Sequence, residues 1–148
     1  MSKGMEKRPR NSMKLEFKSL AANVSFARTA VAIFASQMDF TVDQIDEIKV
    51  AVSEAVSNAV IHGKKDESSS VYLEALLYDD SLVVIISDDG PGIQDVSWAM
   101  EPGTTTADRM GLGFVFIKEY MDELEIDSAP GAGTRVTMIK RLALRVEH

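Results

Sequence analysis

Two polar side chains near the middle of the chain have the types and the spacing that metal-dependent phosphoryl transfer requires. Glu54 and Asn58 are four residues apart, so in a helix they project from the same side. A carboxamide oxygen suits Mg²⁺, which completes its coordination with waters and phosphate oxygens. A glutamate one turn earlier could accept the proton of a hydroxyl group near the terminal phosphate. Taken alone, the pair is better explained as part of a solvated helix face.

A second segment, residues 88–92 (DDGPG), directly follows an apolar run. Asp88 could accept a hydrogen bond from the exocyclic amine of adenine. Gly90 and Gly92 lack a Cβ, so the backbone can turn sharply and pass close to a flat base. The same five residues also make a good turn at the end of a strand. Their place directly after the apolar run favours the nucleotide interpretation.

Two further segments complete the pattern. Gly111 and Gly113 are predicted at the start of a helix, where outward-pointing backbone amides and the helix dipole favour a phosphate. Arg109, just before them, could pair with the β- or γ-phosphate. Thr134 opens the last predicted strand after a glycine-containing turn and could touch adenine through its hydroxyl or a water. Each has a structural alternative, but the four segments in this order predict a Mg-nucleotide site.

The bulk composition is that of an ordinary globular domain. The 148 residues are 45% hydrophobic and 26% charged, which fits one domain with a real core. Without cysteine there is no disulfide or thiolate metal site, and no apolar run is long enough for a membrane span. The net charge of −7 argues against nucleic-acid or anionic-membrane binding. We expect a cytoplasmic protein that binds other proteins.

Apolar periodicity predicts the elements that must position these residues. Predicted strands cover residues 13–18, 71–77, 82–87, 124–127 and 134–142. Predicted helices run to about residue 37 or 38, from 41 to 63, and from about 111 to 122, with a short helical turn at 96–100. The expected architecture is α+β: a two-layer sandwich in which helices pack on one face of a mixed β-sheet. Residues 1–12 are expected to be a disordered basic arm, 13–142 the folded domain and 143–148 a tail.

The helix predicted at 41–63 carries the Glu–Asn pair. Thr41 and Gln44 have capping-box spacing. The predicted buried stripe consists of Ile45, Ile48, Val52, Ala55 and Ala59. Gly63 is well placed to end the helix in a left-handed conformation.

These segments resemble the ATP-binding fold shared by gyrase B, Hsp90, sensor histidine kinases and MutL. Its first box corresponds to Glu54 and Asn58, its second to residues 88–92, and its third to residues 111–113. More narrowly, residues 13–141 resemble the anti-sigma-factor serine kinases of spore-forming bacteria. That resemblance is carried by residues 25–28 (SFAR), 52–63 (VSEAVSNAVIHG) and 110–114 (MGLGF).

The resemblance implies a double function. Such proteins bind and block an RNA polymerase sigma factor, and they use Mg-ATP to phosphorylate a serine of a small anti-anti-sigma protein. It implies that Glu54 is the catalytic base, that Asn58 is the Mg²⁺ ligand and that Arg28 contacts the protein partners. The implied nucleotide contacts are Asp88, Gly90, Gly92 and Thr134 on the adenine side, and Arg109, Gly111 and Gly113 on the phosphates.

Other functions share this chemistry. A sensor histidine kinase needs a phosphoacceptor histidine on a helical hairpin, yet the only histidines are His62 and His148. A stress-response anti-sigma serine kinase and a sigma-binding module without kinase activity stay as alternatives. Retention of Glu54 and Asn58 argues against the second. The first strand is also expected to pair across a homodimer, because edge strands are natural pairing sites.

Overall fold

Strands and helices follow one another in the order that the sequence pattern predicts. The structure is a computed structural model, and it describes residues 8–93 and 108–143. The elements of this part are β1 (Asn11–Lys18), α1 (Ala22–Ala35), α2 (Val42–His62), β2 (Ser70–Leu77), β3 (Ser81–Asp88), α4 (Asp108–Tyr120), β4 (Glu123–Ser128) and β5 (Thr134–Arg141).

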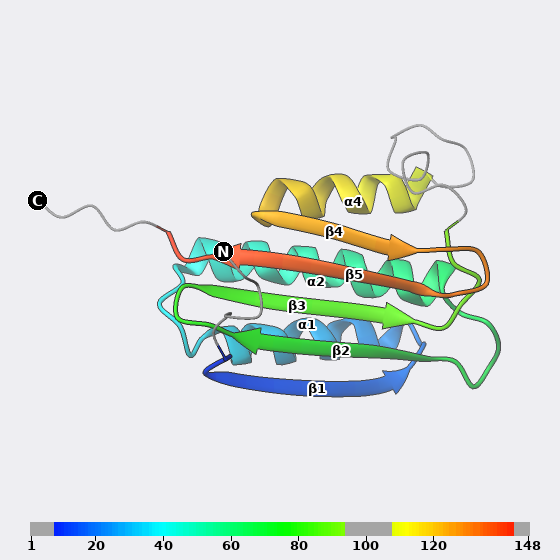
Figure 1. Cartoon of the computed structure of the whole chain (residues 1–148), viewed down its shortest axis with the longest axis horizontal. Helices are drawn as coiled ribbons and strands as arrows, with labels where there is room; N and C mark the ends of the chain where they lie inside the picture. Colours follow the sequence, from blue (N-terminus) through cyan, green and yellow to red (C-terminus); the bar gives the residue numbers. More distant parts are fainter. Residues whose placement is uncertain (1–7, 94–107, 144–148) are drawn as a thin grey trace, which may run out of the picture.

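The strands form one twisted sheet in the order β1-β2-β3-β5-β4. The helices α1, α2 and α4 all lie on one face of it, as Figure 1 shows. The predicted two-layer α+β sandwich is therefore confirmed, and β3 is the central strand. We expected a mixed sheet, but each pairing among the described strands is antiparallel. β3 and β4 run in the same direction, but β5 lies between them and pairs antiparallel with both.

The core lies between the sheet and the helices. In β3 the residues Leu82, Val84 and Ile86 are fully buried, whereas the alternate residues face the open side and are half-buried. This alternation follows from the two-residue repeat of a strand. From the other layer, Val52 of α2 and Phe114 of α4 are fully buried. The helices cover only one face of the sheet. Only alternate residues of the continuous apolar run in β3 are therefore fully buried.

Helix α2 is the longest described helix, and its start is fixed as predicted. Thr41 accepts a hydrogen bond from the backbone N–H of Gln44, and the Gln44 side chain accepts one from the backbone N–H of Thr41. This is the predicted capping box. The helix ends at His62, but Gly63 has φ −100° and ψ 0°, so the left-handed ending that we predicted is wrong.

Several other boundaries differ from the predictions by one to three residues, among them the end of α1 at Ala35 rather than at residue 37 or 38. β1 begins at Asn11 rather than at residue 13, because residues 11 and 12 still pair with the end of β2. α4 begins at Asp108, three residues before the predicted start. It buries Phe114 and Ile117 and leaves Val115 exposed. The helical turn predicted at residues 96–100 lies outside the described residues.

None of the helices in the described ranges has the length and apolar character needed to cross a lipid bilayer.

Candidate nucleotide-binding site

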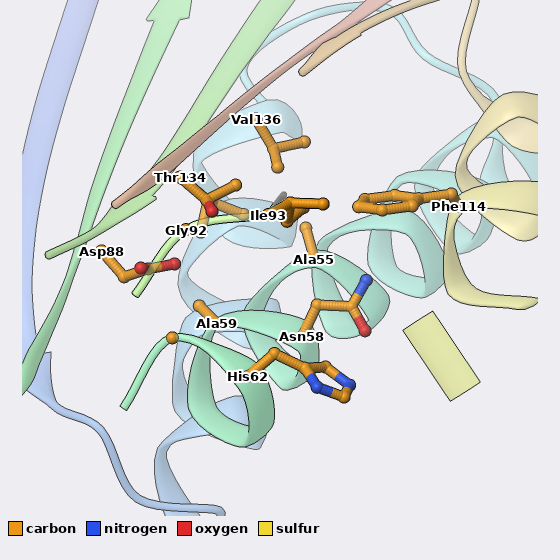
Figure 2. Close-up of a pocket in the computed structure, with 12 residues that line it drawn as sticks. Ala55, Asn58, Ala59, His62, Asp88, Gly92, Ile93, Phe114, Thr134 and Val136 are labelled. Atoms are coloured by element: carbon orange, nitrogen blue, oxygen red, sulfur yellow. The ribbon is translucent and has the colours of Figure 1, made fainter. Parts of the chain in front are cut away.

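The four sequence segments converge at one end of the sandwich. In Figure 1 the C-terminal end of α2, the end of β3, the start of β5 and the first turns of α4 lie at the same, right-hand end. A pocket lies there, and Figure 2 shows Asn58 of α2 on one side of it and Thr134 of β5 on another. Its lining residues are Ala55, Asn58, Ala59, His62, Gly63, Ile86, Asp88, Gly92, Ile93, Phe114, Thr134 and Val136.

Glu54 and Asn58 meet α4 at a single point, Gly113. A Cβ atom on Gly113 would lie 3.0 Å from Oε1 of Glu54 and 3.1 Å from Nδ2 of Asn58. Both α2 side chains are half-buried. The pair is therefore neither in the hydrophobic interior nor on an open helix face. It lies where the first and third segments touch, and the absence of a side chain at Gly113 leaves the room that the two polar groups use.

The carboxamide nitrogen of Asn58 is a buried polar atom without a hydrogen-bond partner in the described part of the chain. This Nδ2 atom is inaccessible to solvent. Such groups are costly unless a ligand satisfies them. The nitrogen and oxygen of a carboxamide exchange by a half-turn of the terminal bond, so this position can also present an acceptor oxygen. That fits a ligand such as a hydrated Mg²⁺ ion.

A metal held there would take few protein ligands. No group of three or more His, Cys, Asp or Glu residues with metal-binding geometry occurs in residues 8–93 and 108–143. Mg²⁺ is commonly held by one or two protein oxygens together with phosphate oxygens and waters. The donor set around Asn58 fits that arrangement, in which the nucleotide itself completes the coordination.

Asp88 is the buried acidic group of the pocket. It is 8% exposed, and its Oδ1 accepts a hydrogen bond of 2.9 Å from the backbone N–H of Gly90. Burial raises the pKa of Asp88 above its ordinary value of 3.8, and the negative charge of Asp89 adds to the rise. Backbone hydrogen bonds from Gly90 and Thr134 oppose the rise. A buried carboxylate with remaining acceptor capacity suits recognition of an amine.

Gly63 explains how Asp88 reaches the pocket. A Cβ atom on Gly63 would lie 2.3 Å from Cγ of Asp88 and 2.4 Å from its Oδ2. The end of α2 and the end of β3 can therefore approach this closely only with glycine at position 63. Close approach to the carboxylate, rather than a left-handed conformation, requires this glycine. Gly63 belongs to the segment 52–63 that carries the family resemblance. The sequence did not predict that Gly63 lies against Asp88.

Thr134 lies directly across the sheet from Asp88. The two residues pair in the register of β3 and β5, and the Thr134 hydroxyl lies 2.8 Å from that of Ser128. The Ser128 hydroxyl also accepts a hydrogen bond of 2.7 Å from the backbone N–H of Ile93. The predicted residue Gly92 lines the same pocket. Gly90 lies beside it, because a Cβ there would be 2.2 Å from the carbonyl oxygen of Gly63.

Sequence reasoning missed the apolar part of the lining. Ile86, Ile93, Phe114 and Val136 all line the pocket, and Ile93 and Phe114 are drawn and labelled in Figure 2. A flat apolar wall beside one buried acceptor is the usual makeup of a small-molecule site. Ile86, Phe114 and Val136 were predicted within strands or a helix and so within the core, whereas Ile93 was in no predicted element. Nothing in the sequence separates core residues from those that border a pocket.

The predicted phosphate-binding residues Arg109, Gly111 and Gly113 all lie within α4, which begins earlier than predicted. Because α4 begins at Asp108, Gly111 and Gly113 are within its first turns. The backbone amides without a helical partner are those of the first four residues, so Gly113 contributes room for Glu54 and Asn58 and not a free amide. Gly111 is buried. Arg109 lies in the first turn, and its side chain is outside the described structure.

Arg28 lies on α1, beside the turn of α2 that carries Glu54. Its Nη1 donates to Ser53 Oγ at 3.3 Å, and its Nη2 donates to Ser25 Oγ at 3.1 Å. A surface hollow separate from the pocket is lined by Arg28, Asp46, Lys49, Val50, Ser53 and Glu54. The predicted partner-binding residue and the predicted base therefore border one hollow.

Comparison with known proteins agrees with this geometry. The histidine kinase-like ATPase domain matches residues 17–140. The chain is 45% identical over 133 residues to the anti-sigma F factor of Caldanaerobacter subterraneus subsp. tengcongensis, which covers 88% of this chain and 93% of that protein. It is 46% identical over 138 residues to the anti-sigma F factor of Oceanobacillus iheyensis, covering 90% and 94%.

These matches define the family. The chain belongs to the histidine kinase-like ATPase domain family and, within it, to the anti-sigma F factors. The domain is thus an ATP-binding domain of the kinase-like type.

Solved structures share the fold at low sequence identity. The RsbU and RsbW domains of a Mycobacterium tuberculosis protein match with a TM-score of 0.62 at 20% identity, over 90% of this chain and 32% of that one. The histidine kinase domain of a blue-light activated kinase from Erythrobacter litoralis matches with a TM-score of 0.55 at 23% identity, over 82% and 60%. At these identities the likeness concerns the fold alone.

Proposed function

We propose that this chain inhibits a sporulation sigma factor of RNA polymerase and, using Mg-ATP, phosphorylates a serine of an anti-anti-sigma protein. The observation that carries the kinase part is the meeting of Glu54 and Asn58 at Gly113, beside a pocket that contains Asp88. The likeness to anti-sigma F factors, over 88% to 90% of this chain, supports the regulatory part. Serine specificity, the metal and the partners belong to the proposal.

The residues of the pocket divide the work of holding the nucleotide. Asp88 accepts a hydrogen bond from the exocyclic amine of adenine. The apolar residues Ile86, Ile93 and Val136 pack against the ring. Thr134 supports the base through its hydroxyl. At the other end, Asn58 holds Mg²⁺, and Arg109 and the first amides of α4 hold phosphate oxygens. Mg-ATP supplies the phosphoryl group and the metal that neutralises its charge.

Glu54 acts on the acceptor rather than on the nucleotide. Its carboxylate borders both the point where Asn58 meets α4 and the outer hollow. A serine hydroxyl that enters through the hollow would reach Glu54 before it reaches Asn58. Glu54 would hold this hydroxyl by a hydrogen bond and take up its proton, which is the role of a general base.

Arg28 gives the regulatory function its contact point. The Arg28 guanidinium is half-buried and held by two serine hydroxyls. No carboxylate within residues 8–93 and 108–143 forms an ion pair with it. Its charge is therefore available to an acidic side chain of a protein partner. Because the hollow that it borders also contains Glu54, a sigma factor and a phosphoacceptor protein would compete for one surface.

The proposal includes a homodimer through β1. This strand is at one edge of the sheet and pairs only with β2 in the described structure. An edge strand presents backbone groups that a second copy can pair with. Sedimentation that finds only monomer at micromolar concentration would reject this part and leave the kinase part standing.

A transfer assay tests the main proposal. The purified chain is incubated with labelled ATP, Mg²⁺ and the cognate anti-anti-sigma protein, and phosphoserine is quantified. We expect label on one serine, and none on a Ser→Ala form of that acceptor. Absence of phosphoserine in every condition, with sigma binding intact, would favour the alternative of a sigma-binding module without kinase activity. Selective binding of a stress-response sigma factor would favour the stress-response alternative.

A further inference from the structure

We infer that Ser53 is a positioning residue that links the partner-binding arginine to the catalytic turn. This inference rests on the proposed function, because it assigns a role within the same surface. Ser53 immediately precedes Glu54 in α2 and accepts a hydrogen bond from Nη1 of Arg28 across the α1–α2 interface. The hydroxyl thus joins the residue that would contact a partner to the residue that would act on its serine.

The long side chain of Arg28 needs hydrogen bonds that fix the orientation of its guanidinium. Arginine has a long side chain that loses considerable rotamer freedom when it is fixed. Here both terminal nitrogens are held by neutral hydroxyls, Ser53 on α2 and Ser25 one turn earlier on α1. A carboxylate in place of either serine would neutralise the guanidinium. Two hydroxyls fix its direction and leave its full charge for the partner.

The hollow that Arg28 borders continues along α2 to Glu54. The hollow beside Arg28 is lined by residues 46, 49, 50, 53 and 54, which follow one face of α2 at helical spacing. Ser53 is the residue of this face that binds Arg28, and Glu54 ends it. A partner held by Arg28 is therefore held at a defined distance from Glu54. Loss of the Ser53 hydroxyl leaves both charged groups in place but removes the hydrogen bond that ties Arg28 to α2, so that only Ser25 still holds the guanidinium.

The experiment is a double-mutant cycle on partner affinity. The affinity of the full chain for the sigma factor is measured by calorimetry for wild type, Ser53→Ala, Arg28→Ala and the double variant. One hydrogen bond of this kind changes affinity by about threefold to tenfold, so we expect Ser53→Ala to weaken binding by that factor. In the Arg28→Ala background the same change should have no effect, because its only route is through Arg28.

Kinetics and rescue separate positioning from a general structural effect. For transfer to the anti-anti-sigma protein, Ser53→Ala should raise KM for the acceptor and leave kcat and ATP affinity near wild type. Ser53→Thr, which keeps the hydroxyl, should restore both affinity and KM. Thr29→Ala removes an exposed hydroxyl next to Arg28 and serves as the matched control, with no expected change.

Additive effects of Ser53→Ala and Arg28→Ala would overturn the inference, as would failure of Ser53→Thr to restore binding. An Arg28→Ala variant with wild-type affinity would overturn it together with the proposed partner surface. A wild-type chain that binds the sigma factor but transfers no phosphate would reject the kinase proposal alone, because the affinity cycle can still be read without catalysis.

Discussion

The Cα atom of Gly63 lies directly against the carboxylate of Asp88, so closely that a Cβ on Gly63 would be 2.3 Å from the Asp88 Cγ. One residue ends α2, and the other ends β3. The contact fixes the position of the Asp88 carboxylate in the pocket. Asp88 is the only buried acidic residue among the described residues. The C-terminal end of α2 and the proposed adenine acceptor are in direct contact.

Gly63→Ala tests this contact. The added methyl group must displace the Asp88 carboxylate or the end of α2, and overpacking of this kind costs about 1–3 kcal/mol of unfolding free energy. We expect that loss in chemical denaturation, with a parallel loss of ATP affinity in calorimetry. Gly131→Asn is the control, because Gly131 has φ +77° and open space around it, and asparagine tolerates that conformation. Unchanged ATP affinity in Gly63→Ala would contradict the role of the contact.

Asp88→Asn tests the adenine acceptor. The amide keeps the shape but presents an N–H group where a carboxylate acceptor is needed, so ATP affinity should fall by about tenfold or more. In the wild type, affinity should also fall as the pH is lowered through the raised pKa of Asp88. Calorimetry from pH 7 to pH 4.5 should show a larger fall in the wild type than in the variant, because protonation of the terminal phosphate of ATP lowers the affinity of both proteins.

Stability should depend on pH in the opposite sense. Because burial raises the pKa of Asp88 above 3.8, this group contributes stability that is fully present below pH 3.8 and is lost as the pH rises through its folded-state pKa. The unfolding free energy of the wild type relative to Asp88→Asn should therefore decrease from acid to neutral pH. A relative stability that increases over this range would show that Asp88 is not strained by its burial.

Glu54→Gln separates catalysis from binding. The side chain keeps its size next to Gly113 but can no longer accept a proton. We expect phosphate transfer to slow by about two to four orders of magnitude, the usual contribution of a general base. ATP affinity, measured on the same preparation, should stay near the wild-type value. Equal losses in affinity and rate would mean that Glu54 holds the nucleotide instead.

Asn58→Ala tests the metal position. Loss of one contact to a charged ligand costs about 1.5–3 kcal/mol, or about 10- to 100-fold in affinity. We expect that loss for ATP in the presence of Mg²⁺ and a much smaller one in its absence. Because the carboxamide nitrogen is buried without a partner in the described structure, the variant should fold at least as stably as the wild type. The same ATP affinity with Mg²⁺ in both proteins would rule out Asn58 as the ligand.

Arg28→Glu tests the partner surface. Charge reversal at a guanidinium that pairs with an acidic group should weaken sigma binding by about tenfold or more. The unfolding midpoint should change little, because no ion pair to Arg28 is lost in the described part of the chain. Lys65→Glu, the same charge change in an exposed loop, is the control. A variant that still captures the sigma factor in pull-down at wild-type affinity would exclude this surface.

Local rules predicted the elements well where one interaction dominates. The capping box of Thr41 and Gln44 set the start of α2, because it depends on residues three apart in the chain. Apolar and β-branched runs predicted β2 and β3 as strands, and the structure then showed which alternate residues of these runs are buried. The predicted start of an element was wrong where it depends on residues far away in the chain. β1 begins at Asn11 because β2 continues beside it. α4 begins at Asp108, before its two glycines.

The candidate site also has features that the sequence predicted and features that only the tertiary structure shows. The sequence alone determined the reactive residue types, their helical spacing and the glycines around them, because periodicity and motif order are local properties of a chain. Only the tertiary structure decided that Gly113 lies against Glu54 and Asn58, that Gly63 lies against Asp88 and that Ser53 holds Arg28. These are contacts between elements that lie far apart along the chain. They follow from how the helices pack across the sheet, which no local pattern records.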